Sequence, residues 1–308
     1  MRRAVAAVGR ILVTLGLLTL MFVAYELWGT GIFTARAQAH LKREFKQELE
    51  AVHNQSPVIT LPTIPGNKKP PVTIVNPKLL VAPPEGDPLG EIIIKKIGVD
   101  WAVVEGVDKP DLMKGPGHYP GTPLPGQIGN AAIAGHRTTH GAPFFRINEL
   151  AKGDKIVVRT LAGTYTYIVS RAPFSVDPTD YGVVSNTSDA QLTLTSCEPR
   201  YSAARRIVIK AKLERKLSSK PNKPPTRING KKVKPPARKA LATGLQGESN
   251  SVVPTVVWGF VVLFVGCLWW WAYRRWRLPI TWFAGVIPFL IVLVPFYFYL
   301  ERALPNGY

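Results

Sequence analysis

The chain has 308 residues, a length that fits one globular domain with accessory segments better than two large domains. Its 39 lysines and arginines outnumber 20 acidic residues and give a net charge of +19, which indicates an anionic partner such as a membrane surface, an acidic polymer or nucleic acid. With 46% hydrophobic residues the chain cannot be disordered throughout, and two cysteines exclude a disulfide-rich scaffold and a cysteine-clustered zinc site. The 28 prolines predict that part of the chain is an extended linker.

The first apolar segment, residues 11–33, is long enough to cross a bilayer. Its only charged residue is Glu26, near the outer end, and arginines precede it, as in a signal peptide or in an anchor whose N-terminus stays inside. Residues 37–39 read Ala-Gln-Ala and could be a cleavage site, but signal peptides have shorter apolar cores of about 7–15 residues. We therefore expect an uncleaved anchor after a cytoplasmic N-terminus, residues 1–10, and both alternatives export the chain that follows.

Two further apolar segments without charged residues, 252–273 and 278–300, predict a transmembrane hairpin. Residues 274–277 join them and include three arginines, so we expect this turn in the cytoplasm. The chain is then a multi-pass protein of the cell membrane with residues 34–251 outside and an external tail, 301–308. Because this topology separates the external part from DNA and ribosomes, we expect the lipid bilayer as a partner and no nucleic acid; wall polymers and solvent are the other environments for the positive charge.

Two external segments have the composition of linkers. Residues 34–89 begin with a predicted stalk helix, 35–54, whose apolar residues recur every three or four positions; binding a partner is the alternative role for this helix. In the following stretch, 57–88, frequent prolines exclude both helix and sheet. Residues 214–251 hold ten basic and two acidic residues with five prolines, which predicts a solvated tether or an arm that adheres to anionic lipid or wall polymer.

The compact part of the chain is residues 90–213. Short runs rich in β-branched and aromatic residues predict seven or eight strands, with short helices at 110–114 and 144–150. The fold class is therefore mainly β, a closed or nearly closed β-barrel with short helices, flanked by one N-terminal and two C-terminal transmembrane helices.

A cysteine and a histidine at strand ends are the candidate chemical groups. Cys197 follows the predicted strand 191–196 and has no partner for a disulfide in the external part, because Cys267 falls within a predicted span. A thiol nucleophile needs a base and an acid, and histidine supplies both near neutral pH. His136 ends the strand 131–134, and the other histidines lie in the stalk or in loops: His40, His53, His118 and His140. By pattern alone, an inert buried thiol and surface histidines are the alternatives.

An arginine would complete such a site. Its permanent charge and rigid fork of donors suit an oxyanion or a substrate backbone. Arg205 and Arg206 open the next predicted strand, and their side chains point to opposite faces, so only one of them can face Cys197. Each is otherwise a surface charge.

These residues lie in motifs that resemble those of sortases. The sequence Thr-Leu-Thr-Ser-Cys at 193–197, with Arg206 nine residues later, resembles the TLxTC…R signature, and residues 115–137, which end in Gly-His-Arg, look like the sortase histidine region. The resemblance covers residues 88–213 and is closest to class E sortases of actinobacteria. This chain departs from the family in Ser196, where threonine is frequent, and in its C-terminal spans, which many sortases lack; pilin-polymerising sortases often have one.

The resemblance implies a cysteine transpeptidase, in the peptidase/hydrolase class, at the Gram-positive cell surface. Cys197 would attack the Thr–Gly bond in a C-terminal sorting signal of LPxTG or LAxTG type on a surface protein. His136 would protonate the leaving amine, and Arg206 would stabilise the oxyanion or hold the substrate. An amine of a cell wall precursor, or a pilin lysine, would then take the acyl group.

The same resemblance implies no cofactor and no metal; some sortases bind calcium, but the sequence has no convincing acidic cluster. The alternatives are a different exported Cys/His acyltransferase, such as an L,D-transpeptidase or a wall amidase, and a tethered scaffold that binds sorting signals without cleaving them.

Overall fold

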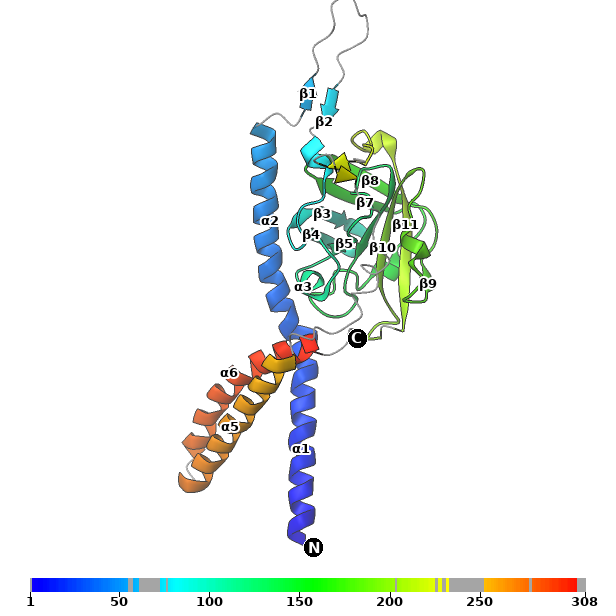
Figure 1. Ribbon diagram of the computed structural model, residues 1–308. Coiled ribbons are helices and arrows are strands. Elements are labelled where there is room, and N and C mark those ends of the chain that lie inside the picture. Colours follow the sequence, from blue (N-terminus) through cyan, green and yellow to red (C-terminus); the bar gives the residue numbers. More distant parts are fainter. Residues whose placement is uncertain are drawn as a thin grey trace, which may run out of the picture. The chain divides into compact units, whose positions relative to one another are not determined.

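The computed structural model describes residues 2–54, 58–60, 73–75, 77–202, 204–224, 227–228, 231–232, 252–276 and 279–303. The chain divides into two compact units, and the first boundary between them along the sequence falls between Tyr25 and Glu26. The elements of each unit are labelled in Figure 1. One unit contains the long apolar helices, and the other contains a β-barrel with a helix beside it.

Eight strands close into a barrel because the first and the eighth strand in the order of the sheet also pair with each other. In order around the barrel they are β10 (Ala190–Glu198), β6 (Gly129–Ala134), β5 (Gly117–His118), β4 (Val99–Glu105), β3 (Pro88–Ile94), β7 (Lys155–Thr160), β8 (Gly163–Val169) and β11 (Arg205–Leu213). A short ninth strand, β9 (Phe174–Val176), pairs with one end of β11. The predicted closed barrel is confirmed.

The barrel interior is filled by aliphatic and aromatic side chains, with the two large tyrosines Tyr165 and Tyr167 completely buried. Each large apolar side chain removed from water contributes about 1.5–3 kcal/mol, so the alternating burial along the strands sets their register. The hydroxyl of Tyr167 accepts a hydrogen bond from Gly126 N at 2.7 Å, which satisfies its polar end. Short helices occur near both predicted places, as α3 (Lys109–Leu112) and a 3₁₀ turn at Ile147–Glu149.

The predicted stalk helix lies along the barrel. The chain passes from α1 (Arg2–Ala24) through a π-helical turn, Tyr25–Gly29, into α2 (Thr30–Asn54), which packs beside β3 and β4 (Figure 1). Leu41 and Phe45 are buried on one face of α2, and Leu41 packs against Ala102 and Val104 of β4. The apolar stripe of this helix therefore covers the outer face of β4.

Polar side chains on the same face of α2 bind the barrel backbone. The Gln38 amide accepts a hydrogen bond from Ala102 N at 2.8 Å and donates to Ala102 O at 3.0 Å and Lys114 O at 2.9 Å. Thr34 Oγ1 donates to Met113 O at 2.8 Å. These buried bonds fix the position of α2 along the barrel, because buried polar groups are costly when unpaired.

The expectation of no sheet within residues 57–88 is wrong. A three-residue strand, β1 (Val58–Thr60), pairs antiparallel with β2 (Thr73–Val75). Both strands are short enough to contain no proline, and the prolines of this segment lie outside them. The missing amide of proline therefore never falls within the ladder.

The barrel unit also continues beyond the expected end at Leu213. Glu214 N donates to Thr166 O at 2.8 Å, and Ile128 N donates to Asn222 O at 2.8 Å. The first residues of the predicted basic linker are therefore hydrogen-bonded to the barrel. These bonds involve backbone groups, so the proline and lysine content of the linker could not predict them. Farther on, β12 (Arg227–Ile228) and β13 (Lys231–Lys232) form a minimal hairpin, and residues 233–251 lie outside the described residues.

Within the described residues, three helical stretches are long and apolar enough to cross a membrane, and they include α1, α5 (Val252–Trp276) and α6 (Pro279–Ala303). Arg274 and Arg275 lie in the last turn of α5, whereas the sequence suggested a loop over 274–277. Arginine is a good helix former and its charge is favourable at a helix C-terminus, so the helix extends to Trp276. Residues 277–278, between the two helices, and the tail from residue 304 lie outside the described residues.

We predict that the packing of α2 stabilises the barrel. Phe45→Ala should lower the free energy of unfolding by about 3–5 kcal/mol, the usual loss for a buried phenylalanine. Leu49→Ala is the control on the same helix, since Leu49 is 40% exposed, and it should have a much smaller effect. Thermal unfolding of the full chain in detergent, followed by circular dichroism, measures both changes. Equal effects of the two substitutions would contradict a docked α2.

Candidate active site

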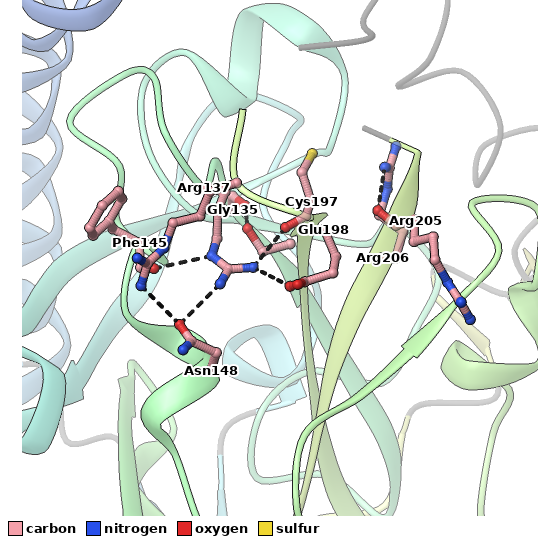
Figure 2. Close-up of polar contacts among 10 residues, drawn as sticks. Gly135, Arg137, Phe145, Asn148, Cys197, Glu198, Arg205 and Arg206 are labelled. Atoms are coloured by element: carbon pink, nitrogen blue, oxygen red, sulfur yellow. Dashed lines mark hydrogen bonds and ion pairs between the residues drawn. The ribbon is translucent and has the colours of Figure 1, made fainter. Parts of the chain in front are cut away.

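Cys197 and Arg206 occupy directly opposite positions at the end of an antiparallel strand pair. The register of β10 and β11 pairs Cys197 with Arg206 and Glu198 with Arg205. Side chains of directly opposite residues project from the same face of a sheet and lie within about 5 Å at Cβ. In Figure 2 the Cys197 thiol and the Arg206 side chain extend to the same side of the pair, whereas Arg205 extends the other way and donates to Ser175 O at 3.1 Å.

His136 reaches the same place from the opposite edge of β10. β6 runs parallel to β10 with Ala134 opposite Thr195. The pairing continues past the strand end, because Gly135 N donates to Thr195 O at 3.1 Å and Ser196 Oγ donates to Gly135 O at 2.7 Å. His136, the next residue, therefore lies at the same end of β10 as Cys197, so the two pairings of β10 bring the three residues predicted for the site to one end of the barrel.

Only glycine fits at position 135, because there is no room for a side chain beside Phe144. A Cβ atom there would lie 2.6 Å from a ring carbon of Phe144, which is itself completely buried. Glycine therefore allows the chain to pass between β10 and the core immediately before His136.

Burial keeps the His136 imidazole neutral. Desolvation lowers its pKa well below the ordinary 6.5, and the nearby positive charges of His140 and Lys109 act in the same direction. Its Nδ1 lies 3.3 Å from Thr139 Oγ1, and its Nε2 has no hydrogen-bond partner among the described residues. The site thus holds a neutral imidazole with one nitrogen unoccupied by protein groups.

Burial also favours the neutral form of the nucleophile candidate. Desolvation raises the pKa of the half-buried Cys197 thiol above the ordinary 9.0, while the charges of Arg206 and then Arg137 oppose that rise. At neutral pH the predominant pair is therefore a thiol and a neutral imidazole. The thiolate with an imidazolium is a minor form, and the two arginines favour its thiolate half.

Arg137, which the sequence interpretation assigned no role, connects three segments of the site. Its side chain is only 3% exposed. The guanidinium donates to Cys197 O at 2.9 Å, to the Glu198 carboxylate at 2.6 Å, to Phe145 O at 3.1 Å and to Asn148 Oδ1 at 3.0 Å (Figure 2). A sequence pattern cannot distinguish such a buried arginine from one on the surface. The only signal in the sequence was that Arg137 directly follows His136.

Two other histidines, expected in surface loops, are buried. His118 has Nδ1 2.7 Å from the Glu105 carboxylate and Nε2 3.0 Å from Thr122 Oγ1. It therefore connects β4, which contains Glu105, with the loop that follows β5. Tyr119, the next residue, shares a hydrogen bond of 3.0 Å with Thr195 Oγ1 on β10.

His140 lies closer to the site, with its ring centroid 4.6 Å from that of His136. Its backbone amide donates to Thr30 Oγ1 of α2 at 3.1 Å, so the first turn of α2 contacts the loop that carries His136. Among the described residues, no group of three or more His, Cys, Asp or Glu side chains could hold a metal ion.

Comparisons with known proteins identify the domain around this site. A family model for the sortase domain matches residues 92–214. The chain is 30% identical to Sortase SrtE1 of Streptomyces coelicolor over 233 residues, which are 71% of this chain and 59% of that protein. It is 35% identical to Sortase D of Bacillus subtilis over 118 residues, 38% of this chain and 58% of that protein. The chain thus spans less than two thirds of either relative.

Among solved structures, the sortase E of Streptomyces avermitilis is 33% identical, with 44% of this chain and 91% of that chain covered and a TM-score of 0.40. The matched region of the family model contains Cys197, His136 and Arg206.

Proposed function

We propose that this chain, whose residues 92–214 match the sortase domain, is a cysteine transpeptidase of the sortase family, anchored in the membrane, that joins surface proteins to an amine of the cell wall precursor. Its substrates would carry a C-terminal sorting signal of LPxTG or LAxTG type, cleaved between threonine and glycine. The observation that carries the proposal is the convergence of Cys197, Arg206 and His136 at one end of β10.

In the first half-reaction the Cys197 thiolate attacks the threonine carbonyl carbon of the signal. The carbonyl oxygen gains negative charge, which the Arg206 guanidinium, on the same face as the thiol, can stabilise. The His136 imidazolium donates its proton to the leaving glycine amine, and the C–N bond breaks. The products are a thioester on Cys197 and a neutral imidazole.

In the second half-reaction an acceptor amine attacks the thioester. The neutral His136 accepts a proton from the amine as the new amide bond forms, and the Cys197 thiolate leaves. The starting thiolate and imidazolium are regenerated, so the cycle needs no cofactor. Water in place of the amine gives hydrolysis of the signal.

The three apolar helices support anchorage in the cell membrane. Arginines near the N-terminus and at the end of α5 favour a cytoplasmic location for both, and this supports the proposal of a barrel on the extracellular face. A substrate anchored in the same bilayer would meet the barrel at a high effective concentration.

We predict distinct losses of transpeptidation for the site residues. In the full chain, Cys197→Ala and His136→Ala should abolish transfer of an LPxTG or LAxTG peptide to an amine, and Arg206→Ala should lower kcat by about 10²–10³, as expected for one lost oxyanion donor. Arg205→Ala, the matched control on the opposite face, should retain most activity. Mass spectrometry of the products, with and without amine, measures the transfer. Loss at Arg205 with none at Arg206 would overturn the arginine assignment.

The pH dependence of kcat/KM should be bell-shaped. The thiolate is lost as pH falls, and the imidazolium is lost as pH rises. Because burial lowers the pKa of His136 from 6.5 and raises that of Cys197 from 9.0, the plateau between the two limbs should extend below pH 6.5 and above pH 9.0, and activity should decline only outside this range. With chemistry limiting the rate, a decline of kcat/KM within this range would contradict the assignment of the two limbs to His136 and Cys197.

The proposed topology is tested by labelling intact cells with a membrane-impermeant thiol reagent. In a background with Cys197→Ser and Cys267→Ser, a cysteine introduced at Asn250 should react and one introduced at Trp276 should not, because arginines retain the α5–α6 connection in the cytoplasm. The reverse pattern would invert the hairpin and move the barrel to the cytoplasmic face.

A further inference from the structure

Arg137 holds the backbone of the nucleophile from inside the protein. One of its amino groups, Nη1, donates to both the carbonyl oxygen of Cys197 and the carboxylate of Glu198. Cys197 and Glu198 form the last two rungs of the β10–β11 ladder, after which the chain turns away. The bond to the Cys197 carbonyl therefore fixes the peptide unit that determines where the thiol points.

The remaining donors of Arg137 fix a second segment, the loop before and within the 3₁₀ turn at Ile147–Glu149. Nε donates to Phe145 O and Nη2 donates to Asn148 Oδ1. Because Arg137 directly follows His136, this one side chain ties the histidine loop, the Phe145 loop and the end of β10 into one unit, as Figure 2 shows.

The chemistry of these contacts favours arginine over any other residue. Four acceptors in three directions match the planar fork of donors on a guanidinium, whereas a lysine ammonium would satisfy fewer of them. The buried charge is compensated by Glu198, whose side chain is 29% exposed. Arg137 also acts electrostatically, since its charge opposes the desolvation that disfavours the Cys197 thiolate.

The roles of the two arginines beside Cys197 are therefore different. Arg206 lies on the face of the thiol, where a substrate oxygen would be. Arg137 is covered by protein and its donors are directed at protein acceptors, so it cannot contact the substrate.

We propose that Arg137 is a positioning residue for the transpeptidation, which aligns Cys197 with His136 through the Cys197 carbonyl and promotes the thiolate by its charge. The kinetic part of this inference rests on the proposed function. The thiol chemistry of Cys197 does not, because alkylation by iodoacetamide reports thiolate formation without any peptide substrate.

The test uses the full chain in detergent with Cys267→Ser, so that Cys197 is the single cysteine. Arg137→Gln removes the charge, while Arg137→Lys retains the charge and loses the fork. Both should lower kcat at least tenfold with KM changed less than twofold, because the thiol is misdirected after the substrate has bound. In alkylation across pH, Arg137→Gln should shift the midpoint to higher pH by about 0.5–1 unit, and Arg137→Lys should shift it less.

Arg146→Gln is the matched control. Arg146 is exposed, follows Phe145 directly and pairs only with Glu149 among the residues that the structure describes, so both readouts should stay at the level of the parent chain. If the two Arg137 variants lose thermal stability but retain the parent kcat and alkylation midpoint, Arg137 is structural only and the proposal is wrong.

Asn148→Ala decides the question if the Arg137 variants do not fold. Asn148 is exposed and accepts from Arg137 Nη2, so its removal should leave folding intact and loosen the guanidinium. We expect kcat to fall several-fold with KM unchanged, and an unchanged kcat would refute the proposal. If the parent chain transfers no peptide, the proposed function is wrong. The alkylation midpoints of Arg137→Lys and Arg137→Gln, or of Asn148→Ala, then still show whether Arg137 promotes the thiolate.

Discussion

β10 hydrogen-bonds to two strands from distant parts of the chain, β6 along one edge and β11 along the other. Closure of the barrel depends on this double pairing, and so does the site, because His136 follows β6, Arg206 begins β11 and Cys197 lies between them near the end of β10. A shift of one residue in either pairing would turn alternate side chains to the other face and separate the thiol from Arg206. The buried aliphatic side chains of all three strands oppose such a shift, since it would move them into water.

The same burial that fixes the register works against the chemistry. It raises the pKa of the thiol and lowers that of the imidazole, and so disfavours the charged pair. Two guanidinium groups partly offset the effect of burial on the thiol, Arg206 on the face of the thiol and Arg137 from within the protein. The charged form of this pair is therefore a minority species in a largely buried environment, where charges interact more strongly than in water.

α2 connects the barrel to the first apolar helix of the chain through bonds near the site. Gln38 and Thr34 bind the barrel backbone, and Thr30 accepts a hydrogen bond from the amide of His140. His140 in turn packs against His136. The helix that follows the first apolar segment is thus continuous with the packing around the site, and the barrel unit begins at Glu26 rather than after the proline-rich segment.

The sequence by itself determined the features that depend on local composition. Three long apolar segments, of which only the first contains a charged residue, predicted the apolar helices. Alternating β-branched residues predicted the strands, because burial of a strand face imposes a period of two. Cys197 and His136 could be selected because each ends such a strand. The resemblance to sortases supplied Arg206, which the alternation of side chains alone did not distinguish from Arg205.

Only the tertiary structure decided the features that depend on contacts between distant segments. The β10–β11 register places Arg206, and not Arg205, opposite Cys197. The four acceptors of Arg137 come from loops that no sequence period connects, and the burial of His118 depends on Glu105 in another strand. Likewise, the apolar stripe of α2 predicted a helix with one buried face, but its covering surface is formed by β4, about 60 residues away in the chain. The spacing of apolar residues shows which face of a helix or strand is buried. The segment that covers this face is determined by how the barrel closes, which the spacing does not show.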